Sequence, residues 1–271
     1  MSIKNVRPSL KSAMPSALET NCTRPVVLVM DSLDSERDQS QQIFNKLSFL
    51  GNTILGSSYR RGLKICLALV GDSCGREKFQ VQDFTNQPDL SEKVKSFSVD
   101  FSKGESSDFN DYGLAALYFT RNVKMSRAKK PILIFVADKS PRETVPRGLA
   151  SFSHINLSVD VKITKAIKQL KEKYEVYVIL KPTDRAPYSE AMNQNKWEKL
   201  VGLDHLCQLT SMYRAADVIM GILAKEYGTV EEFHNNLISR QAEGTVKEVY
   251  KSLSEIHSDF YNKGVLLQLR K

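Results

Sequence analysis

Acidic and hydroxyl side chains follow apolar runs of the chain at a spacing that could hold a cation. Asp31 comes directly after the apolar residues 26–30, and Asp138 comes directly after another such run. Ser35 follows Asp31 by four residues, and Asp108 lies in a third polar loop. Carboxylate and hydroxyl oxygens are the ligands that hard cations such as Mg²⁺, Mn²⁺ or Ca²⁺ prefer. Each aspartate also suits a helix cap or a turn. The sequence therefore leaves a metal site and a set of caps as alternatives.

The elements that would position these side chains alternate between strand and helix. Apolar runs with the length of buried strands, and one alternating run, predict strands at residues 26–30, 63–70, 78–84, 132–137 and 175–180. Apolar residues at helical spacing predict helices at residues 36–50, 90–99, 111–125 and 160–173. This order is typical of an α/β fold with a doubly wound, mostly parallel sheet flanked by helices. Such sheets bind ligands beyond the carboxyl ends of their strands, where Asp31 and Asp138 stand.

Three segments differ in predicted structure. Residues 1–24 show no sustained period and predict an extended or loose N-terminal arm. Residues 25–210 carry the predicted α/β domain, with one more short element expected at residues 197–206. Residues 211–271 predict a C-terminal helical extension that either packs on the sheet domain or faces a partner. Its predicted helices are residues 211–226, 229–242 and 244–260.

The composition, with 41% hydrophobic and 26% charged residues, is that of an ordinary globular protein. No apolar run has the length of a membrane span, and residues 1–24 lack the apolar core of a secretory signal. The four cysteines form no C-x-x-C pair, which argues against a zinc site and a disulfide scaffold and favours a cytoplasmic location. The net charge of +8 would suit an acidic partner, nucleic acid included, but the basic residues are spread along the chain.

The order of motifs resembles the von Willebrand factor A (vWA) domain family. Residues 26–35, VVLVMDSLDS, are similar to the first vWA strand and its D-x-[S/T]-x-S metal motif, the MIDAS. Residues 69–72 and 79–85 resemble the second strand and hairpin of the vWA subclass found in alpha-kinase proteins. The loop at residues 105–111 resembles the glycine-rich loop of that subclass. Residues 132–138 resemble the strand that ends in the last metal-site aspartate.

The resemblance covers about residues 24–182 and implies a vWA-type fold with a degenerate metal motif. The ligands that it implies are Asp31, Ser35, Asp108 (or Asn110) and Asp138. Leu33 replaces the hydroxyl residue that would be the second ligand, and Asp34 stands where the family usually has a small residue. The glycines before Asp108 are replaced by glutamate and serine. These departures leave open whether the site binds metal at all.

A vWA-like domain implies a binding module rather than an enzyme. In this family the loops at the carboxyl edge typically bind a partner, often through a partner carboxylate that completes the coordination of the metal. We therefore expect a non-enzymatic adaptor or assembly module with a protein partner, acting with Mg²⁺ (or Mn²⁺ or Ca²⁺) or without any metal. The loop residues expected to contact the partner are Asp34, Phe109, Asn110 and Lys139.

Two other functions stay open at this stage. The positive charge is compatible with a nucleic-acid-associated vWA-like protein, although no aromatic and basic residues alternate as in RNA-binding sheets. A Mg²⁺-dependent phosphoryl transfer or hydrolysis at the aspartate cluster is the third alternative. The sequence contains no Walker motif, dinucleotide fingerprint or nucleophile elbow, so we assign no catalytic residue.

Overall fold

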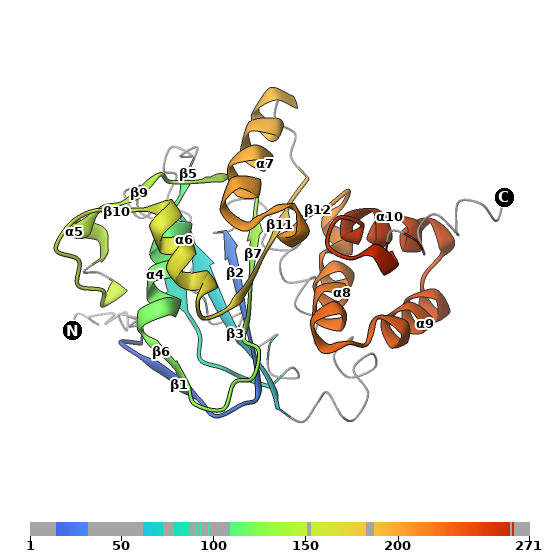
Figure 1. The fold of residues 1–271 in the computed structure, drawn as a ribbon, viewed down its shortest axis with the longest axis horizontal. Coiled ribbons are helices and arrows are strands. Elements are labelled where there is room, and N and C mark those ends of the chain that lie inside the picture. Colours follow the sequence, from blue (N-terminus) through green and yellow to red (C-terminus); the bar gives the residue numbers. More distant parts are fainter. Residues whose placement is uncertain are drawn as a thin grey trace, which may run out of the picture.

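The computed structural model describes most of the chain beyond its first residues (Figure 1). The described residues are 15–31, 62–72, 79–86, 90, 93, 97, 109–150, 153–182, 187–260 and 262. The helix predicted at residues 36–50 and most of the helix predicted at residues 90–99 lie outside them.

A six-stranded sheet forms the centre of the molecule. Its strands, in order across the sheet, are β12 (Leu206–Gln208), β11 (Glu175–Leu180), β7 (Ile132–Ala137), β2 (Arg24–Asp31), β3 (Leu63–Val70) and β4 (Gln80–Val81). The neighbouring strands are parallel, apart from the antiparallel edge pair β3 and β4. Every residue of β7 is buried, as expected for a parallel strand with helices on both faces. The prediction of a mostly parallel, doubly wound sheet is confirmed.

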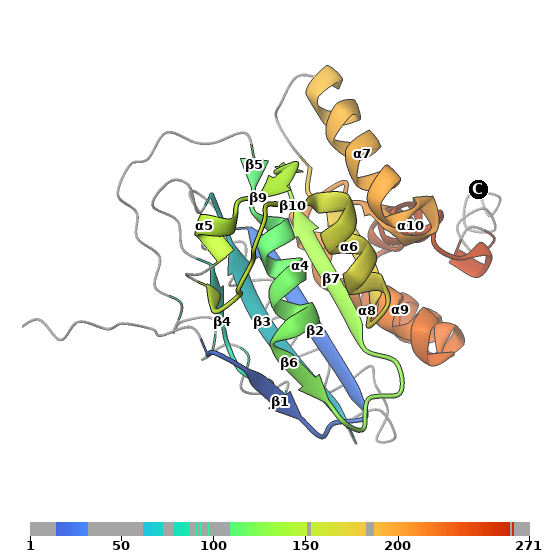
Figure 2. The ribbon, with the colours of Figure 1, turned by 60° about the vertical axis from the view of Figure 1, so that its left-hand side comes forward.

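One face of the sheet is covered by α4 (Tyr112–Arg121), α6 (Ile163–Lys171) and α7 (Pro187–Val201). Figure 2 shows α4 and α6 side by side over this face, and α7 projecting past the end of β7. Trp197 of α7 is completely buried, and its ring packs 5.0 Å from Tyr112 and 5.6 Å from Phe135. This tryptophan anchors α7 on the core, so the short element predicted at residues 197–206 is the end of a longer helix followed by strand β12.

The other face is covered by α8 (Ala215–Tyr227), α9 (Val230–Arg240) and α10 (Glu243–Leu253). In Figure 1 these helices lie on the side of the sheet opposite α4 and α6. All residues of α8 from Ala215 to Ala224 are buried, so this helix lies inside the core rather than on its surface. Its Gly221 faces Leu253 of α10, and a Cβ there would lie 2.4 Å from a leucine methyl. The described C-terminal helices thus pack on the sheet instead of standing apart from it.

The segment around residue 18 is an extended strand within the predicted N-terminal arm. Within the arm predicted at residues 1–24, β1 (Leu18–Thr20) forms a strand that pairs with β6 (Val123–Met125). The helix predicted at residues 111–125 therefore ends at Arg121. The physical reason is Asn122, which holds the first strand beside the end of the helix. Its side-chain amide donates to the Ser16 backbone carbonyl (2.8 Å), and its backbone carbonyl accepts a hydrogen bond from the Leu18 N–H (2.8 Å).

The remaining described elements are short connections around the sheet. They are β5 (Phe109–Asn110), β8 (Ser140–Pro141), β9 (Thr144–Val145), β10 (Val161–Lys162), α5 (Arg147–Ala150), η3 (Leu203–His205) and η4 (Met212–Arg214). Strand β5 pairs with β8, which ties the loop before α4 to the loop after β7. In the described part of the chain, no helix has both the length and the apolar composition needed to cross a membrane.

Candidate functional site

Two aspartates and one lysine meet where the central strands end. Asp31 is the last residue of β2, and Asp138 and Lys181 directly follow β7 and β11. Because β11 pairs with β7 and β7 with β2, all in parallel, these three ends lie next to one another at the carboxyl edge of the sheet. The register places Leu180 beside Ala137, so Lys181 leaves the sheet beside Asp138. The sheet therefore brings together Asp31 and Asp138, as predicted, and adds a lysine.

Asp31 is the centre of this cluster and is only 2% exposed. Its Oδ1 forms an ion pair with Lys181 Nζ at 2.9 Å, and both side chains are buried. Its Oδ2 accepts hydrogen bonds from the Tyr112 hydroxyl (2.5 Å), the Asp138 backbone N–H (2.9 Å) and the Asn110 amide (3.4 Å). One oxygen of this carboxylate thus accepts three hydrogen bonds, and the other forms an ion pair but has no hydrogen-bond partner among the described residues.

The two aspartates differ in ionisation. Burial alone would raise the pKa of Asp31, but the Lys181 ammonium and hydrogen bonds from Asp138 and Tyr112 hold that pKa well below the usual range. Burial, and then the charge of Asp31, raise the pKa of Asp138 well above the usual range. Burial and the Asp31 carboxylate also raise the pKa of Tyr112, so its hydroxyl stays a donor. Asp31 is therefore the carboxylate of the pair, and Asp138 keeps its proton to a higher pH.

Helix α7 is fixed to the same edge by its polar side chains. The Asn193 amide donates to the Asp138 carbonyl (3.2 Å), and its carbonyl oxygen accepts from the Ser140 hydroxyl (3.1 Å). The Trp197 indole N–H donates to the Lys139 carbonyl (3.1 Å). These contacts give hydrogen-bond donors to two backbone carbonyls of the loop after β7, and they hold α7 beside Asp138.

The other predicted contact residues are placed as follows. Asn110 is 1% exposed, so its side chain serves the buried cluster. Phe109 is half-buried, with Lys196 Nζ 5.2 Å from its ring centre, and Lys139 is half-buried beside α7. Three of the predicted residues lie outside the described part of the chain: Asp34, Ser35 and Asp108.

Sequence reasoning missed Lys181 and the hydrogen bond of Tyr112. Lys181 follows a predicted strand by one residue, as Asp31 and Asp138 do, which was the available signal. Reading that signal as a contact needs the strand order, because Lys181 reaches Asp31 only if β7 lies between their strands. Tyr112 sits at the start of α4, where its side chain points back toward the sheet edge.

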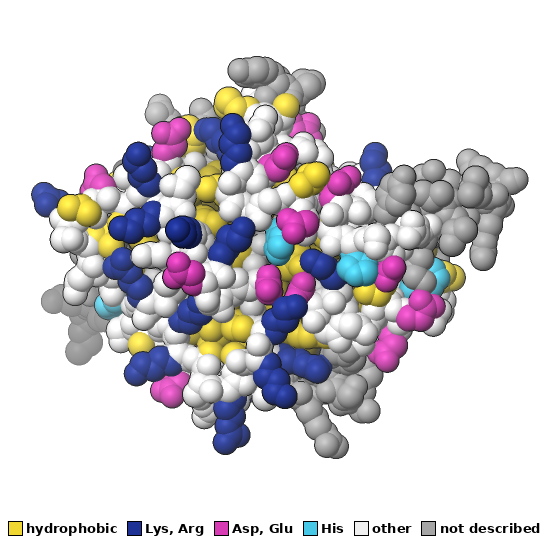
Figure 3. Space-filling model, viewed as in Figure 1, with side chains coloured by type: hydrophobic (Ala, Val, Ile, Leu, Met, Phe, Trp, Pro, Cys, Tyr) yellow, Lys and Arg dark blue, Asp and Glu magenta, His cyan; other side chains and the backbone are white. Residues whose placement is uncertain are grey.

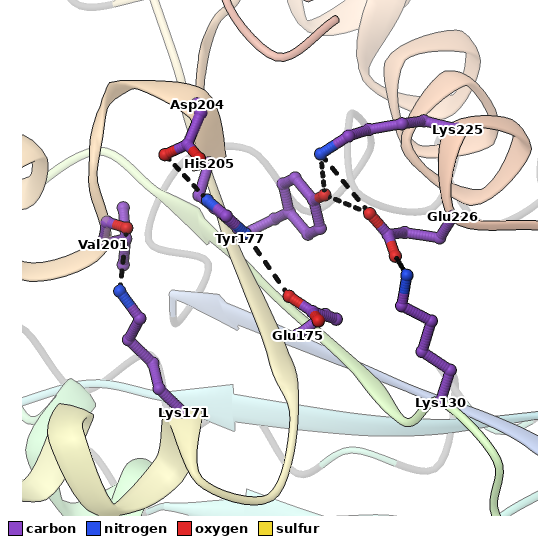
Figure 4. Close-up of polar contacts among 9 residues, drawn as sticks. All are labelled: Lys130, Lys171, Glu175, Tyr177, Val201, Asp204, His205, Lys225 and Glu226. Atoms are coloured by element: carbon purple, nitrogen blue, oxygen red, sulfur yellow. Dashed lines mark hydrogen bonds and ion pairs between the residues drawn. The ribbon is translucent and has the colours of Figure 1, made fainter.

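A second polar cluster lies between β11 and the last turn of α8 (Figure 4). The Tyr177 hydroxyl donates to Glu226 (2.5 Å) and accepts from Lys225 (2.5 Å), and Glu226 also pairs with Lys130 (2.5 Å). Burial alone would raise the pKa of Glu226, but Lys130 and Tyr177 outweigh it and lower that pKa. Figure 4 shows Tyr177 and Lys130 in contact with the end of α8, which fixes this helix to the sheet. The neighbouring pair His205 and Glu175 links η3 to β11.

Lysines line a shallow groove between α6 and α7. The groove has a volume of about 380 Å³ and is lined by Thr164, Lys168, Lys171, Glu172, Lys199 and Leu200. Lys171 Nζ donates to the Val201 carbonyl at 3.0 Å, so one of these lysines is also a link between the two helices. Figure 3 shows lysine and arginine side chains spread over the face of the molecule that carries these helices.

Comparisons with known proteins identify the class of fold. No protein-family model matches the sequence, and no curated protein matches it in sequence. The vWF domain of the type V pili tip protein Mfa5 from Porphyromonas gingivalis has a similar structure, with a TM-score of 0.50 and 12% identity over 78% of this chain and 97% of that one. The pilus adhesin SpaC from Lactobacillus rhamnosus GG is similar over 80% of this chain and 32% of its own, with a TM-score of 0.51 and 11% identity. The chain therefore has a vWA-type α/β fold.

A third similar structure is proximal thread matrix protein 1 from the mussel byssus, described with a zinc-occupied MIDAS motif. It has a TM-score of 0.49 and 12% identity, over 80% of this chain and 49% of that one. This chain spans about half or less of the length of the matrix protein and of SpaC.

The described residues do not fit the metal that this fold family implies. A divalent cation needs free lone pairs and a negative site. Here Asp31 Oδ2 accepts three hydrogen bonds, whereas Asp31 Oδ1, Asn110 Oδ1 and Asp138 Oδ1 have no hydrogen-bond partner among the described residues. The lone pairs are present, but the site is not negative, because the buried Lys181 ammonium lies 2.9 Å from Asp31 Oδ1 and balances the charge of Asp31. In the described part of the chain, no group of three or more histidine, cysteine or acidic residues is placed to hold a metal ion. The described carboxyl edge is a salt-bridged cluster.

Proposed function

We propose that this chain is a non-enzymatic protein-binding module that engages a protein partner at the carboxyl edge of its vWA-type sheet. The contact surface comprises the outer part of α7, the segment after β12, and the loop residues Phe109 and Lys139. The observation that carries this proposal is the exposure of Met192 and Tyr213 at this edge. Met192 is 44% exposed and Tyr213 is 64% exposed.

The surroundings of these two side chains support the assignment. Met192 precedes Asn193, which contacts the end of β7, and Tyr213 lies in η4, at the carboxyl end of β12. The first half of α7 is joined to β12 by a hydrogen bond from Gln208 to Glu190 (2.8 Å). Methionine and aromatic residues are enriched in protein interfaces, and lysine is depleted from interface centres but common at their rims. Met192 and Tyr213 therefore suit the anchors of an interface.

The proposal is tested by comparing variants of the full chain in affinity capture from the source organism, with quantitative mass spectrometry. The variants are Met192→Ser and Tyr213→Ser. The matched control is Leu203→Ser, because Leu203 is 45% exposed but lies in η3, at the opposite end of β12.

We expect a partner that the wild type and Leu203→Ser retain and that both edge variants lose by about tenfold or more, as for interface anchors. The captured partner should then bind the purified chain directly. A partner set that is equal for all four proteins would contradict the proposal.

Nucleic-acid binding is the second candidate, because of the lysines that line the groove between α6 and α7. Fluorescence anisotropy with single-stranded RNA and DNA tests it, with Lys168→Gln and Lys199→Gln as variants. Phosphate contacts predict affinity that falls steeply with salt and is weakened by both substitutions. Binding that does not respond to salt or to these substitutions would exclude this groove.

A further inference from the structure

We infer that the ammonium of Lys181 takes the place of a divalent cation at the strand-end aspartate, so that this vWA-type edge is built to work without metal. The inference concerns the same edge as the proposed partner surface. Its test uses no partner, so that either proposal can fail while the other stands.

The first support is the geometry of the ion pair. Lys181 Nζ lies 2.9 Å from Asp31 Oδ1, and the two side chains are 5% and 3% exposed. A buried carboxylate needs a compensating positive charge, which a metal ion or a side chain can provide. Here the chain itself provides it. A divalent cation at Asp31 would have to lie beside this ammonium, and in a buried site that repulsion is strong.

The second support is the state of the other carboxylate oxygen. Asp31 Oδ2 accepts the Tyr112 hydroxyl, the Asp138 N–H and the Asn110 amide. All three donors point at this one oxygen. The donors come from α4, the end of β7 and β5, so displacing them would disturb three elements. Donors thus hold Oδ2, whereas Oδ1 has no hydrogen-bond partner among the described residues and lies 2.9 Å from the Lys181 ammonium.

The third support is the place of Lys181 in the sheet. Its strand lies two positions from that of Asp31, a separation of roughly 10 Å given the usual spacing between strands. A long, flexible lysine chain can span the end of β7 to reach Asp31, whereas a short side chain at this position could not. The lysine passes Asp138, whose Oδ1 is buried and has no hydrogen-bond partner among the described residues. Asp31 Oδ1 and Asn110 Oδ1 are likewise buried without a hydrogen-bond partner in the described part of the chain. The Lys181 ammonium, 2.9 Å from Asp31 Oδ1, already supplies a positive charge to this buried site.

The inference is tested by titrating chelator-stripped full-length chain with Mg²⁺, Mn²⁺ and Zn²⁺, using calorimetry and thermal unfolding. The decisive variant is Lys181→Met, which keeps much of the side-chain length and removes the charge. Lys181→Arg is the matched control because it keeps a cation. Asp31→Asn in the Lys181→Met background removes the carboxylate that a new metal would use.

We expect no saturable binding and no metal-dependent change in Tm for the wild type and Lys181→Arg. Lys181→Met should bind Mn²⁺ saturably and gain several degrees in Tm from it, and the added Asp31→Asn change should abolish both effects. The inference is overturned if the wild type binds one metal ion in an Asp31-dependent way. It is also overturned if folded Lys181→Met shows no response to metal.

If Lys181→Met does not fold without metal, refolding it in the presence of Mn²⁺ decides the matter. Recovery of the folded state by Mn²⁺, and not by the same ionic strength of Na⁺, supports the inference. Failure to recover, together with Asp31-dependent metal binding by the wild type, overturns it.

Discussion

The ion pair between Asp31 and Lys181 couples the stability of the carboxyl edge to both partners at once. A buried charge that loses its partner is far more unfavourable than the loss of the attraction itself, because the remaining ion stays out of water. The pair is nearly inaccessible to solvent, with side-chain exposures of 3% and 5%. Substituting either residue alone should therefore lower the free energy of unfolding more than is expected from its share of the effect of substituting both.

A double-mutant cycle tests this coupling. We expect Lys181→Met to lower the free energy of unfolding by about 3–5 kcal/mol, as for one partner removed from a buried pair. The Asp31→Asn, Lys181→Met double variant should be less destabilised than the sum of the two single variants, by about 1–3 kcal/mol. Urea denaturation measures all four proteins, and Lys139→Met serves as the half-exposed control. Additive single effects would mean that the two charges do not compensate each other.

The raised pKa of Asp138 predicts a pH dependence of stability. Because the folded protein holds this proton more tightly than the unfolded chain, the contribution of Asp138 is full below the ordinary aspartate pKa. It is lost as the pH rises through the raised pKa. We therefore expect the free energy of unfolding to fall as the pH rises from the ordinary aspartate pKa to the raised pKa of about 8 and to level off above it, and Asp138→Asn to flatten this slope.

Urea denaturation of both proteins over a pH series, with chelator present, checks this expectation. The lowered pKa of Asp31 acts in the opposite sense, since its stabilisation is lost only in strong acid, and it leaves the alkaline side unaffected. An identical slope in the wild type and Asp138→Asn would show that another group carries the dependence.

At the scale of elements, α8 is held in the core by close packing and by the polar cluster at its last turn. Gly221 allows α8 to approach α10, because a Cβ at this position would lie 2.4 Å from Leu253 Cδ1. Interior positions with this little room are usually destabilised by added methyl groups. The absence of a side chain at Gly221 therefore determines how closely α8 and α10 approach each other.

The pair Gly221 and Leu253 gives a prediction for this contact. In the wild type, we expect overpacking by Gly221→Ala to lower the free energy of unfolding by about 1–3 kcal/mol. The higher helix propensity of alanine offsets part of this loss. Leu253→Ala alone should cost about 2–5 kcal/mol by leaving a cavity. In that background, Gly221→Ala should be neutral or stabilising. Thermal and urea unfolding measure the cycle, and Gly244→Ala, which has open space around it, is the control.

The strands were predictable from sequence to within a residue or two where they are buried on both faces. Residues 132–137 are a continuous apolar run and residues 63–70 are apolar apart from Lys64; both are bounded by polar or turn residues, and they form β7 and β3. The end of α4 was not predictable, because β6 is a strand only through its pairing with β1. Lys181 was missed for the same reason, since its partner is fixed by the order of strands and not by spacing along the chain.

At the scale of the whole molecule, two apolar clusters lie on opposite faces of one sheet. The first combines alternate residues of β2, such as Leu28 and Met30, with residues of α8, α9 and α10. The second combines the other residues of β2, such as Val27 and Val29, with α4, α6 and Trp197. Strand β2 is therefore the element shared by both halves of the core, and it ends in Asp31 at the candidate site.

This arrangement has a consequence for synthesis on the ribosome. Strand β2 leaves the ribosome early, whereas α8–α10, which share its apolar cluster, come after residue 214. At about 5–20 residues per second, roughly 10–40 s separate the two events. During that interval the nascent chain carries the apolar residues of β2, and then those of β3 and β7 as they emerge, without these helices beside them. The chain is therefore expected to depend on a holding chaperone until its last helices emerge.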